Sequence, residues 1–177
     1  MMSRKRHRRN EYRLSSGILA RIILPVTLTV ILFGMSIFLL MIPLIAEKLR
    51  DGKREMIREL TESSWSILAA LAQKDAAGQL TRQEAQTAAV ENIRGLRYGP
   101  ELKDYFWLND MHPHIIMHPY RPDLDGKDIS SYADPNGKRL FVEFVRVVRE
   151  KGAGYVDYEW QWKDDPERIV PKISYVK

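Results

Sequence analysis

The sequence predicts an α+β domain carried on a membrane anchor, and three observations predict it. Residues 22–45 form a run without a formal charge that is long enough to span a bilayer. Residues 47–74 repeat apolar side chains at helical spacing, which predicts a long helix continuing from the span. Beyond residue 100, short strands and one helix follow each other with short links, which predicts an antiparallel sheet rather than a parallel one.

The charge of the chain is concentrated at its start. The net charge is +5 overall, yet residues 1–21 hold seven Lys or Arg against one acid, so the rest of the chain is close to neutral. A basic flank before an apolar span is expected to stay in the cytoplasm. Considered by themselves, the basic residues of Arg4–Arg9 could also bind anionic lipid or nucleic acid. The near-neutral body gives no electrostatic reason to expect nucleic acid as a partner.

The apolar run is too long for a secretory signal peptide, whose apolar core has about 7–15 residues. We therefore predict a transmembrane helix at 22–45, with a cytoplasmic tail before it and the rest of the chain outside the cytoplasm. The chain has no cysteine, which excludes disulfides and thiolate metal sites.

The helix predicted over 47–74 has one stripe at alternating steps of four and three residues. We expect the upper half of this stripe to face a core and the lower half to form a stalk or a dimer contact. The stripe contains Met56, Leu60, Ser63, Ile67 and Ala70.

A second helix is predicted after Gly78, which is a typical helix stop. Thr81 and Glu84 have the spacing of a capping box, and Gly99-Pro100 is expected to end the helix. The short link predicts that the two helices pack as an antiparallel pair.

Residues 104–110 and 114–118 predict a β-hairpin. Because side chains alternate across a strand, Tyr105 and Trp107 should share one face of the first strand. On the second strand His114, Ile116 and His118 should share a face. Rings and imidazoles would then converge on one side of the hairpin.

The remaining elements follow in order. Residues 120–132 are polar and predict a loop, and Asp134-Pro135 predicts the start of a helix that ends at Gly152. Residues 155–162 alternate and predict a half-exposed strand, with a turn at 163–167 and a last strand at 169–177. The apolar face of the 155–162 strand holds Val156, Tyr158, Trp160 and Trp162.

These elements could form a site for a small carboxylate, which needs a few placed donors in an apolar cavity. Lys172 offers a point charge and Arg97 a bidentate fork. These residues also have purely structural interpretations. Arg97 could stabilise a helix C-terminus, and Trp107 and Tyr158 could simply fill the core. His118 could cap the end of a strand, and Lys172 could be a solvated residue on an edge strand. The candidates are Arg97, Tyr98, Tyr105, Trp107, His118, Tyr158 and Lys172.

Two other chemistries are less well supported by the residues. His112, His114 and His118 are possible metal ligands, but no carboxylate or cysteine pattern completes a site. His118 could act as a base oriented by Asp110, but no nucleophile, cofactor motif or pair of spaced carboxylates accompanies it. We therefore predict no metal, no cofactor and no enzymatic activity.

Several segments, in this order, resemble the single Cache domain family (type 2): YFWLND, HIIMHP, LDGKDIS, DPNGKRLF, GAGYVDYEWQW and VPKISYVK. The resemblance begins near residue 47. It implies a long N-terminal helix, a PAS-like antiparallel sheet flanked by helices, and a pocket for acids such as acetate, propionate or pyruvate. It also implies that Tyr105, Trp107, His118, Tyr158 and Lys172 surround the ligand.

The resemblance and the residues together predict a cytoplasmic tail at 1–21, a transmembrane helix at 22–45 and a Cache sensor domain at 46–177. In the family a further strand, a second transmembrane helix and an output module follow, so we expect the last strand of the domain to be missing here.

The predicted function is a sensor for organic acids of two to four carbons (C2–C4) in transmembrane signalling, such as chemotaxis or a two-component system. The alternative is a stand-alone binding protein or a partner subunit of a separate receptor. We expect a single-pass protein of the inner membrane, with its sensor domain in the periplasm or outside the cell. A homodimer through the N-terminal helix is also expected.

Overall fold

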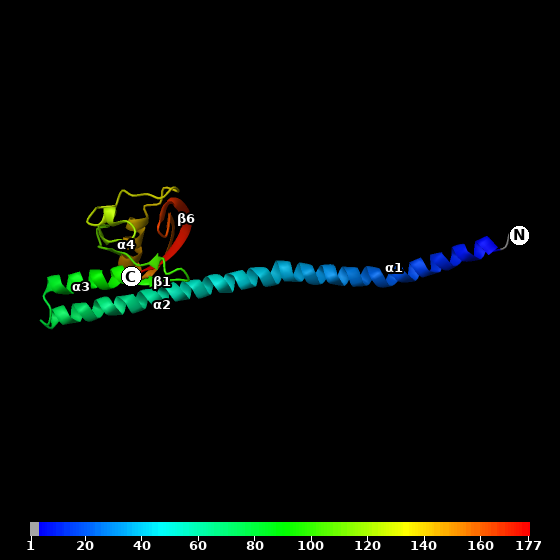
Figure 1. The fold of residues 1–177 in the computed structure, drawn as a ribbon, viewed down its shortest axis with the longest axis horizontal. Coiled ribbons are helices and arrows are strands. Elements are labelled where there is room, and N and C mark those ends of the chain that lie inside the picture. Colours follow the sequence, from blue (N-terminus) through cyan, green and yellow to red (C-terminus); the bar gives the residue numbers. More distant parts are fainter. Residues whose placement is uncertain (1–3) are drawn as a thin grey trace. The chain divides into compact units, whose positions relative to one another are not determined.

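The structure is a computed structural model that describes residues 4–177, with side chains described at residue 17 and from residue 20 onward. The chain divides into two compact units, one ending at Lys53 and the other running over Arg54–Lys177. Figure 1 shows the helices and strands of both units along the chain. Apart from Arg21, the basic residues of the predicted tail lie outside the described side chains.

The first part of the chain is helical. Helix α1 covers Arg4–Ser36, a π-helical turn follows at Ile37–Met41, and α2 covers Ile42–Ala76. Among the described residues there is one helix, Ala20–Ala76, long and apolar enough to cross a membrane. Its apolar side chains between Ile22 and Ile45 are exposed, as a surface that contacts lipid requires.

Helix α2 turns inward a face that only partly coincides with the predicted stripe. Leu60 and Ile67 of the stripe are half-buried, whereas Met56, Ser63 and Ala70 are exposed and Ser64, outside the stripe, is buried. The hydroxyl of Ser64 donates to the carbonyl of Leu60 at 2.9 Å, so this polar side chain is satisfied within its own helix and can be buried. The other inward-facing residues, all half-buried, are Ile57, Thr61, Leu68 and Leu71.

Helix α3 covers Arg82–Gly95 and begins as predicted. The Thr81 side chain accepts from the backbone of Glu84, and the Glu84 carboxylate accepts from the backbone of Thr81. Gly78 has φ +68°, which suits the stop after α2. The helix ends earlier than predicted, because the chain is extended at Leu96 and enters strand β1 at Arg97–Tyr98.

The strands form three antiparallel pairs. Strand β1 pairs with β2 at Asp104–Tyr105, β3 at Leu108–Asn109 pairs with β4 at Ile115–Met117, and β5 at Gly154–Trp162 pairs with β6 at Asp165–Val176. The single strand predicted over 104–110 is therefore two short strands with different partners. The β5–β6 hairpin confirms the two long strands predicted near the end of the chain, but β6 begins at Asp165, within the predicted turn at 163–167.

Helix α4 covers Leu140–Lys151 and starts later than predicted. Asp134 does not cap it. Its Oδ1 accepts from the backbone N–H groups of Asn136 and Lys138, and its Oδ2 accepts from that of Glu159 in β5. The Asp-Pro pattern predicted a helix cap, but the carboxylate organises a turn instead and ties it to the sheet. Gly152, at φ +76°, ends α4 as predicted.

The loop over 120–132 is confirmed and contains a short 3₁₀ helix at Pro122–Leu124. Leu124 and Ile129 are buried, so the loop belongs to the body of the domain. The buried core lies mainly between α4 and the β5–β6 hairpin. Its members are Ile115, Leu124, Ile129, Leu140, Phe141, Phe144, Val147, Val156, Tyr158, Trp160 and Val176.

Candidate ligand-binding site

A small cavity beside α4 gathers side chains that the sequence predicted for a ligand site. Tyr105 ends β2, Trp107 lies in the link between β2 and β3, and Tyr158 comes from the middle of β5. The structure brings these residues from separate segments to one cavity of about 10 Å³, which we call the aromatic cavity. Its lining residues are Tyr105, Trp107, His118, Leu140, Phe141, Phe144, Tyr158 and Trp160.

His118 reaches the cavity because the chain turns inward where β4 ends. Its backbone N–H donates to Oδ1 of Asp125 at 2.7 Å, and its side chain is almost completely buried. The neighbouring Ile116 is 48% exposed, so these two residues do not share a face as predicted. Strand alternation stops at Met117, and Asp125 sets the direction of the residue that follows.

The imidazole of His118 is neutral at physiological pH. Burial lowers its pKa to about 3, and the positive charges of Lys172 and Arg121 add to this effect. Its Nδ1 accepts from the backbone N–H of Tyr120 at 3.3 Å. A neutral ring that accepts at Nδ1 carries its proton on Nε2, so His118 is a hydrogen-bond donor at that atom.

The two tyrosines of the cavity are also neutral donors. Burial raises the pKa of both Tyr105 and Tyr158. The Tyr158 hydroxyl forms a hydrogen bond of 2.9 Å with the hydroxyl of Ser174 in β6. The Tyr105 ring contacts the His118 ring edge-on, with centroids 4.9 Å apart.

Two cations lie close to the cavity. The ammonium nitrogen of Lys172 is 5.0 Å from the centre of the Tyr105 ring. Burial lowers the pKa of Lys172 to about 8, while the negative charge of Asp104 opposes this shift. The guanidinium of Arg121 is 5.9 Å from the centre of the Trp160 ring and is held by two hydrogen bonds of 2.8 Å to Asp123.

Trp160 contributes a donor that has no partner. Its indole Nε1–H is buried and forms no hydrogen bond within the described residues. A hydrogen-bonding interaction with Trp160 works against the rise in the pKa of Tyr105, although the two groups lie outside normal hydrogen-bond geometry. Buried polar groups are normally paired, so this group is available to a ligand.

Sequence reasoning missed Trp160 and Arg121 as site residues. Trp160 could have been found, because it lies on the same predicted face of its strand as Tyr158. Arg121 lies in a polar loop, and no periodic pattern indicates where a side chain in such a loop will point.

Arg97 and Tyr98 do not line the aromatic cavity. The Arg97 guanidinium donates to the carbonyls of Arg94 and Leu96 at 2.8 Å each, so it satisfies the C-terminus of α3. It also lies 5.3 Å from the centre of the Tyr120 ring. The Tyr98 ring packs against Phe106, with centroids 5.3 Å apart.

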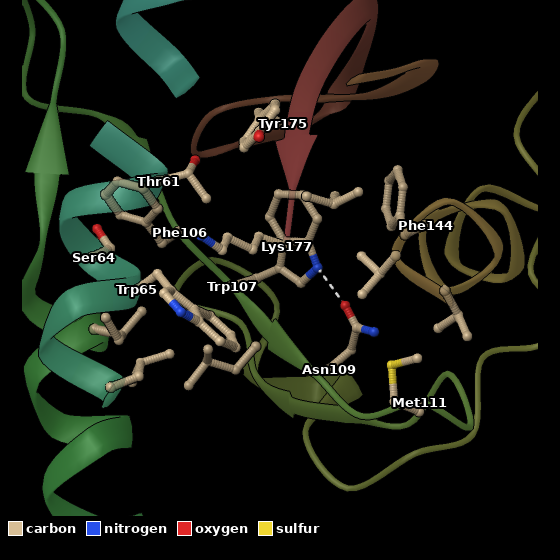
Figure 2. A pocket seen from close by; sticks show the side chains of 16 residues that line it. Thr61, Ser64, Trp65, Phe106, Trp107, Asn109, Met111, Phe144, Tyr175 and Lys177 are labelled. Atoms are coloured by element: carbon tan, nitrogen blue, oxygen red, sulfur yellow. Dashed lines mark hydrogen bonds between the residues drawn. The ribbon is translucent and has the colours of Figure 1, made fainter. Parts of the chain in front are cut away.

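A second and larger cavity, of about 140 Å³, lies between α2 and the rest of the domain. We call it the helix cavity. Figure 2 shows Trp65 on its α2 side and Trp107 and Phe144 on its opposite side. Trp107 and Phe144 line both cavities, and the Trp107 indole is fixed by a 2.9 Å hydrogen bond to Asn109. The helix cavity also has polar side chains in its wall, among them Thr61, Tyr175 and Lys177, whereas the aromatic cavity is lined by the predicted residues Tyr105, His118 and Tyr158.

The sequence also suggested two other chemistries, a base formed by His118 and Asp110 and a metal site formed by histidines. Asp110 accepts from the backbone of His112 and His114 and lies 3.2 Å from Nδ1 of His114, so it does not orient His118. Among the described residues, no group of three or more His, Asp or Glu side chains is arranged to hold a metal ion.

Comparison with known proteins decides the family. The family model for single Cache domain 2 matches residues 49–177. The chain belongs to this family. Its long helix and antiparallel strands are the Cache fold, and residues 49–177 therefore form a sensor domain of the kind found in signalling proteins.

Two curated proteins with Cache similarity are signalling proteins. The methyl-accepting chemotaxis protein McpP of Pseudomonas putida is 40% identical over 139 residues, which cover 78% of this chain and 25% of McpP. The sensor histidine kinase MctS of Rhizobium johnstonii is 30% identical over 91 residues, covering 51% of this chain and 18% of MctS. The chain thus spans a quarter or less of the length of these relatives.

Two solved structures resemble the Cache domain closely. A periplasmic sensor domain of a chemotaxis protein is 43% identical with a TM-score of 0.67, over 71% of this chain and 85% of that one. A Cache chemosensory domain, described for its recognition of carboxylic acids, is 42% identical with a TM-score of 0.68, over 73% and 86% of the two chains.

Proposed function

We propose that this chain is a membrane-anchored sensor that binds small organic acids of two to four carbons outside the cytoplasm. The observation that carries the proposal is the unpaired Nε1–H of Trp160 in the wall of the aromatic cavity. The neutral His118 and the hydroxyls of Tyr105 and Tyr158 supply further donors. The proposed activity is binding rather than catalysis.

The charges around the cavity favour a carboxylate over a neutral ligand or a cation. The lining contains no acidic side chain, and the ammonium of Lys172 lies over the Tyr105 ring. A carboxylate accepts several hydrogen bonds at once and would satisfy the donors that now lack partners. Its short carbon chain would contact the rings of Trp107, Phe144 and Tyr158.

Binding requires the cavity to open. A space of about 10 Å³ is at most the size needed for one water molecule, and an acid of two carbons is larger. The domain must therefore move side chains or a strand to admit the ligand, and a ligand that binds the open form will favour it. This requirement links ligand binding to a change in shape.

Of the predicted site residues, we propose that Tyr105, Trp107, His118, Tyr158 and Lys172 bind the acid. Arg97 and Tyr98 would support the site from outside. The Arg97 guanidinium lies over Tyr120, and Tyr120 packs edge-on against Tyr105 with centroids 5.0 Å apart.

We further propose that residues 1–21 lie in the cytoplasm, that 22–45 span the inner membrane and that the sensor domain, from residue 46 onward, lies in the periplasm or outside the cell. The excess of Lys and Arg before the span supports this orientation. The signal would pass to an output of the chemotaxis or two-component type, as the relatives suggest.

We also propose that the chain forms a homodimer through its N-terminal helix. The exposed residues Met56, Ser63 and Ala70 of α2 follow each other at seven-residue intervals. Two such stripes can pack along a shared seam, as in a coiled coil.

A thermal-shift comparison tests the proposed ligand class. Purified chain in detergent would be heated with acetate, propionate, pyruvate or butyrate, and in parallel with acetamide and propionamide, which keep the shape but lose the charge. At least one acid should raise the melting temperature, and the matching amide should not. If no acid raises it in a sample with a cooperative transition, the proposed ligand class is wrong.

A further inference from the structure

The β5–β6 hairpin contributes to the aromatic cavity at one place and touches α2 at another. Tyr158 of β5 and Lys172 of β6 are paired across the hairpin, beside the aromatic cavity. Three residues further toward the open end of the hairpin, Tyr155 is paired with Tyr175. At about 3.3 Å per residue, the two pairs are about 10 Å apart along the strands.

The second pair holds helix α2 at two points. The Tyr155 hydroxyl donates to the backbone carbonyl of Arg54 at 2.9 Å, and the Arg54 guanidinium lies 5.3 Å from the centre of the Tyr155 ring. The Tyr175 hydroxyl donates to the carboxylate of Glu62 at 3.4 Å. The Tyr155 and Tyr175 rings pack edge-on, with centroids 5.0 Å apart. We call these two tyrosines the tyrosine clasp.

The second point of attachment is reinforced by the residue at the end of β6. The ammonium of Lys177 pairs with Glu62 and lies 5.4 Å from the centre of the Trp65 ring. Figure 2 shows Tyr175 and Lys177 reaching toward α2 from β6. Arg54 and Glu62 are eight residues apart, which is about 12 Å along a helix. Two attachments at this separation fix the tilt of the helix segment as well as its distance from the hairpin.

Close packing does not hold α2 in place beyond the clasp. The helix turns Thr61, Trp65 and Leu68 toward the helix cavity of about 140 Å³, which is partly open to solvent, since Trp65 is 44% exposed. A helix segment with such a void beside it can shift without breaking a packed core. A few directional contacts then decide where it lies.

We propose that the tyrosine clasp is the coupling element that transmits ligand binding from the β5–β6 hairpin to α2. This inference rests on the proposed function, since it assigns a role in signalling to residues that do not line the ligand cavity. When an acid opens the aromatic cavity, Tyr158 and Lys172 move with the hairpin. Tyr155 and Tyr175 move with them and shift α2, which is continuous with the predicted span.

The distance between α2 and α4 tests the clasp directly. Because the chain has no cysteine, Arg58→Cys on α2, an exposed residue outside the proposed dimer stripe, and Lys151→Cys on α4 can carry spin labels in the full chain in lipid nanodiscs. The Tyr155→Phe/Tyr175→Phe variant keeps both rings and removes only the hydroxyls. Tyr132→Phe is the matched control, because it removes a phenol hydroxyl from the loop away from α2.

Without ligand, the clasp variant should at least double the width of the distance distribution, and the control should match the wild type. With propionate, the wild-type distance should shift, and the clasp variant should bind with unchanged affinity while losing more than half of that shift. A clasp variant with the wild-type width, or with the full shift, overturns the inference. If the wild type binds no acid, the proposed ligand class fails, and the ligand-free width still decides whether the clasp holds the helix.

Discussion

The ammonium of Lys172 lies over the ring of Tyr105, 5.0 Å from its centre. Among the described residues no carboxylate forms an ion pair with it, and Asp104 acts on it only at longer range. Lys172 is therefore a partly buried cation held beside a ring, next to a cavity with unpaired donors. A cation in this position is costly for the free protein and useful for binding an anion.

Lys172→Met should separate these two effects. The variant keeps an unbranched side chain of similar length, so it should fold. The pKa of Lys172 is lowered from 10.5 to about 8 in the folded chain, which means that the charged form is disfavoured by folding at pH 7. We expect the variant to melt at the same temperature or higher and to lose at least tenfold in acid affinity. Lys151→Met, at the exposed end of α4, is the control. Calorimetric titration and thermal unfolding measure the two effects.

The affinity for an acid should depend on pH through Lys172 rather than through His118. The pKa of His118 is about 3, so this ring stays neutral and affinity should be constant between about pH 6 and 7. Above pH 8 the free protein loses the Lys172 proton, and affinity should fall by about tenfold per pH unit at most. A midpoint near pH 6.5 in the titrated affinities would show that His118 is charged in the free site, contrary to this account.

Trp160→Phe should weaken binding and also lower the melting temperature somewhat, because the smaller ring leaves unfilled space in the core. The variant removes a buried Nε1–H that has no partner and keeps a ring in the core. Loss of one hydrogen bond to a charged ligand corresponds to about 1.5–3 kcal/mol, or roughly tenfold or more in the dissociation constant. Trp162→Phe is the matched control on the same strand. Unchanged propionate affinity in Trp160→Phe would remove this indole from the site.

Asp134→Ala should destabilise the domain without any direct contact with the cavity. Three backbone N–H groups donate to this buried carboxylate, one of them from β5. Burial alone would raise its pKa, but these donors overcome the effect and leave the pKa below its usual value. We expect a loss of about 2–4 kcal/mol in the free energy of unfolding.

The contribution of Asp134 to stability should disappear as pH falls through its lowered pKa. Denaturant unfolding at pH 7 and in acid measures both the loss and its pH dependence. Asp164→Ala, at the exposed turn between β5 and β6, provides a control for removing a carboxylate. Equal stability of Asp134→Ala and wild type at pH 7 would contradict the structural role of Asp134.

The sequence predicted those elements that local chemistry decides. The capping box of Thr81 and Glu84 and the helix stop at Gly152 depend on residues close in the chain, and the structure confirms both. The alternation predicted over 155–162 is confirmed as far as Trp160 and then fails, because the strand register shifts between Gln161 and Trp162 and Gln161 is buried. The start of α4 was wrong because an Asp before a Pro suits a turn as well as a helix cap. The inward face of α2 was predicted only in part: Leu60 and Ile67 are half-buried. Ser64 was missed because it satisfies its own hydroxyl within the helix, which apolar spacing cannot indicate.

The candidate site was predictable where residues share a strand face and was not where a loop decides the geometry. Tyr105 and Trp107, two residues apart as the alternation requires, line one cavity. Tyr158 joins them through packing rather than strand pairing, because β2 and β5 belong to separate pairs of strands. His118 points inward through its hydrogen bond to Asp125, which lies in the following loop. Contacts made by loop side chains follow no period, so Arg121 and the 3₁₀ turn around it could not be placed from the sequence.

A crystal structure of the chain with propionate at saturating concentration tests the central claim most directly. The account predicts a carboxylate in an enlarged aromatic cavity, within hydrogen-bond distance of Nε1 of Trp160 and Nε2 of His118. Propionate bound in the helix cavity or on the surface, with the aromatic cavity still closed, would contradict it.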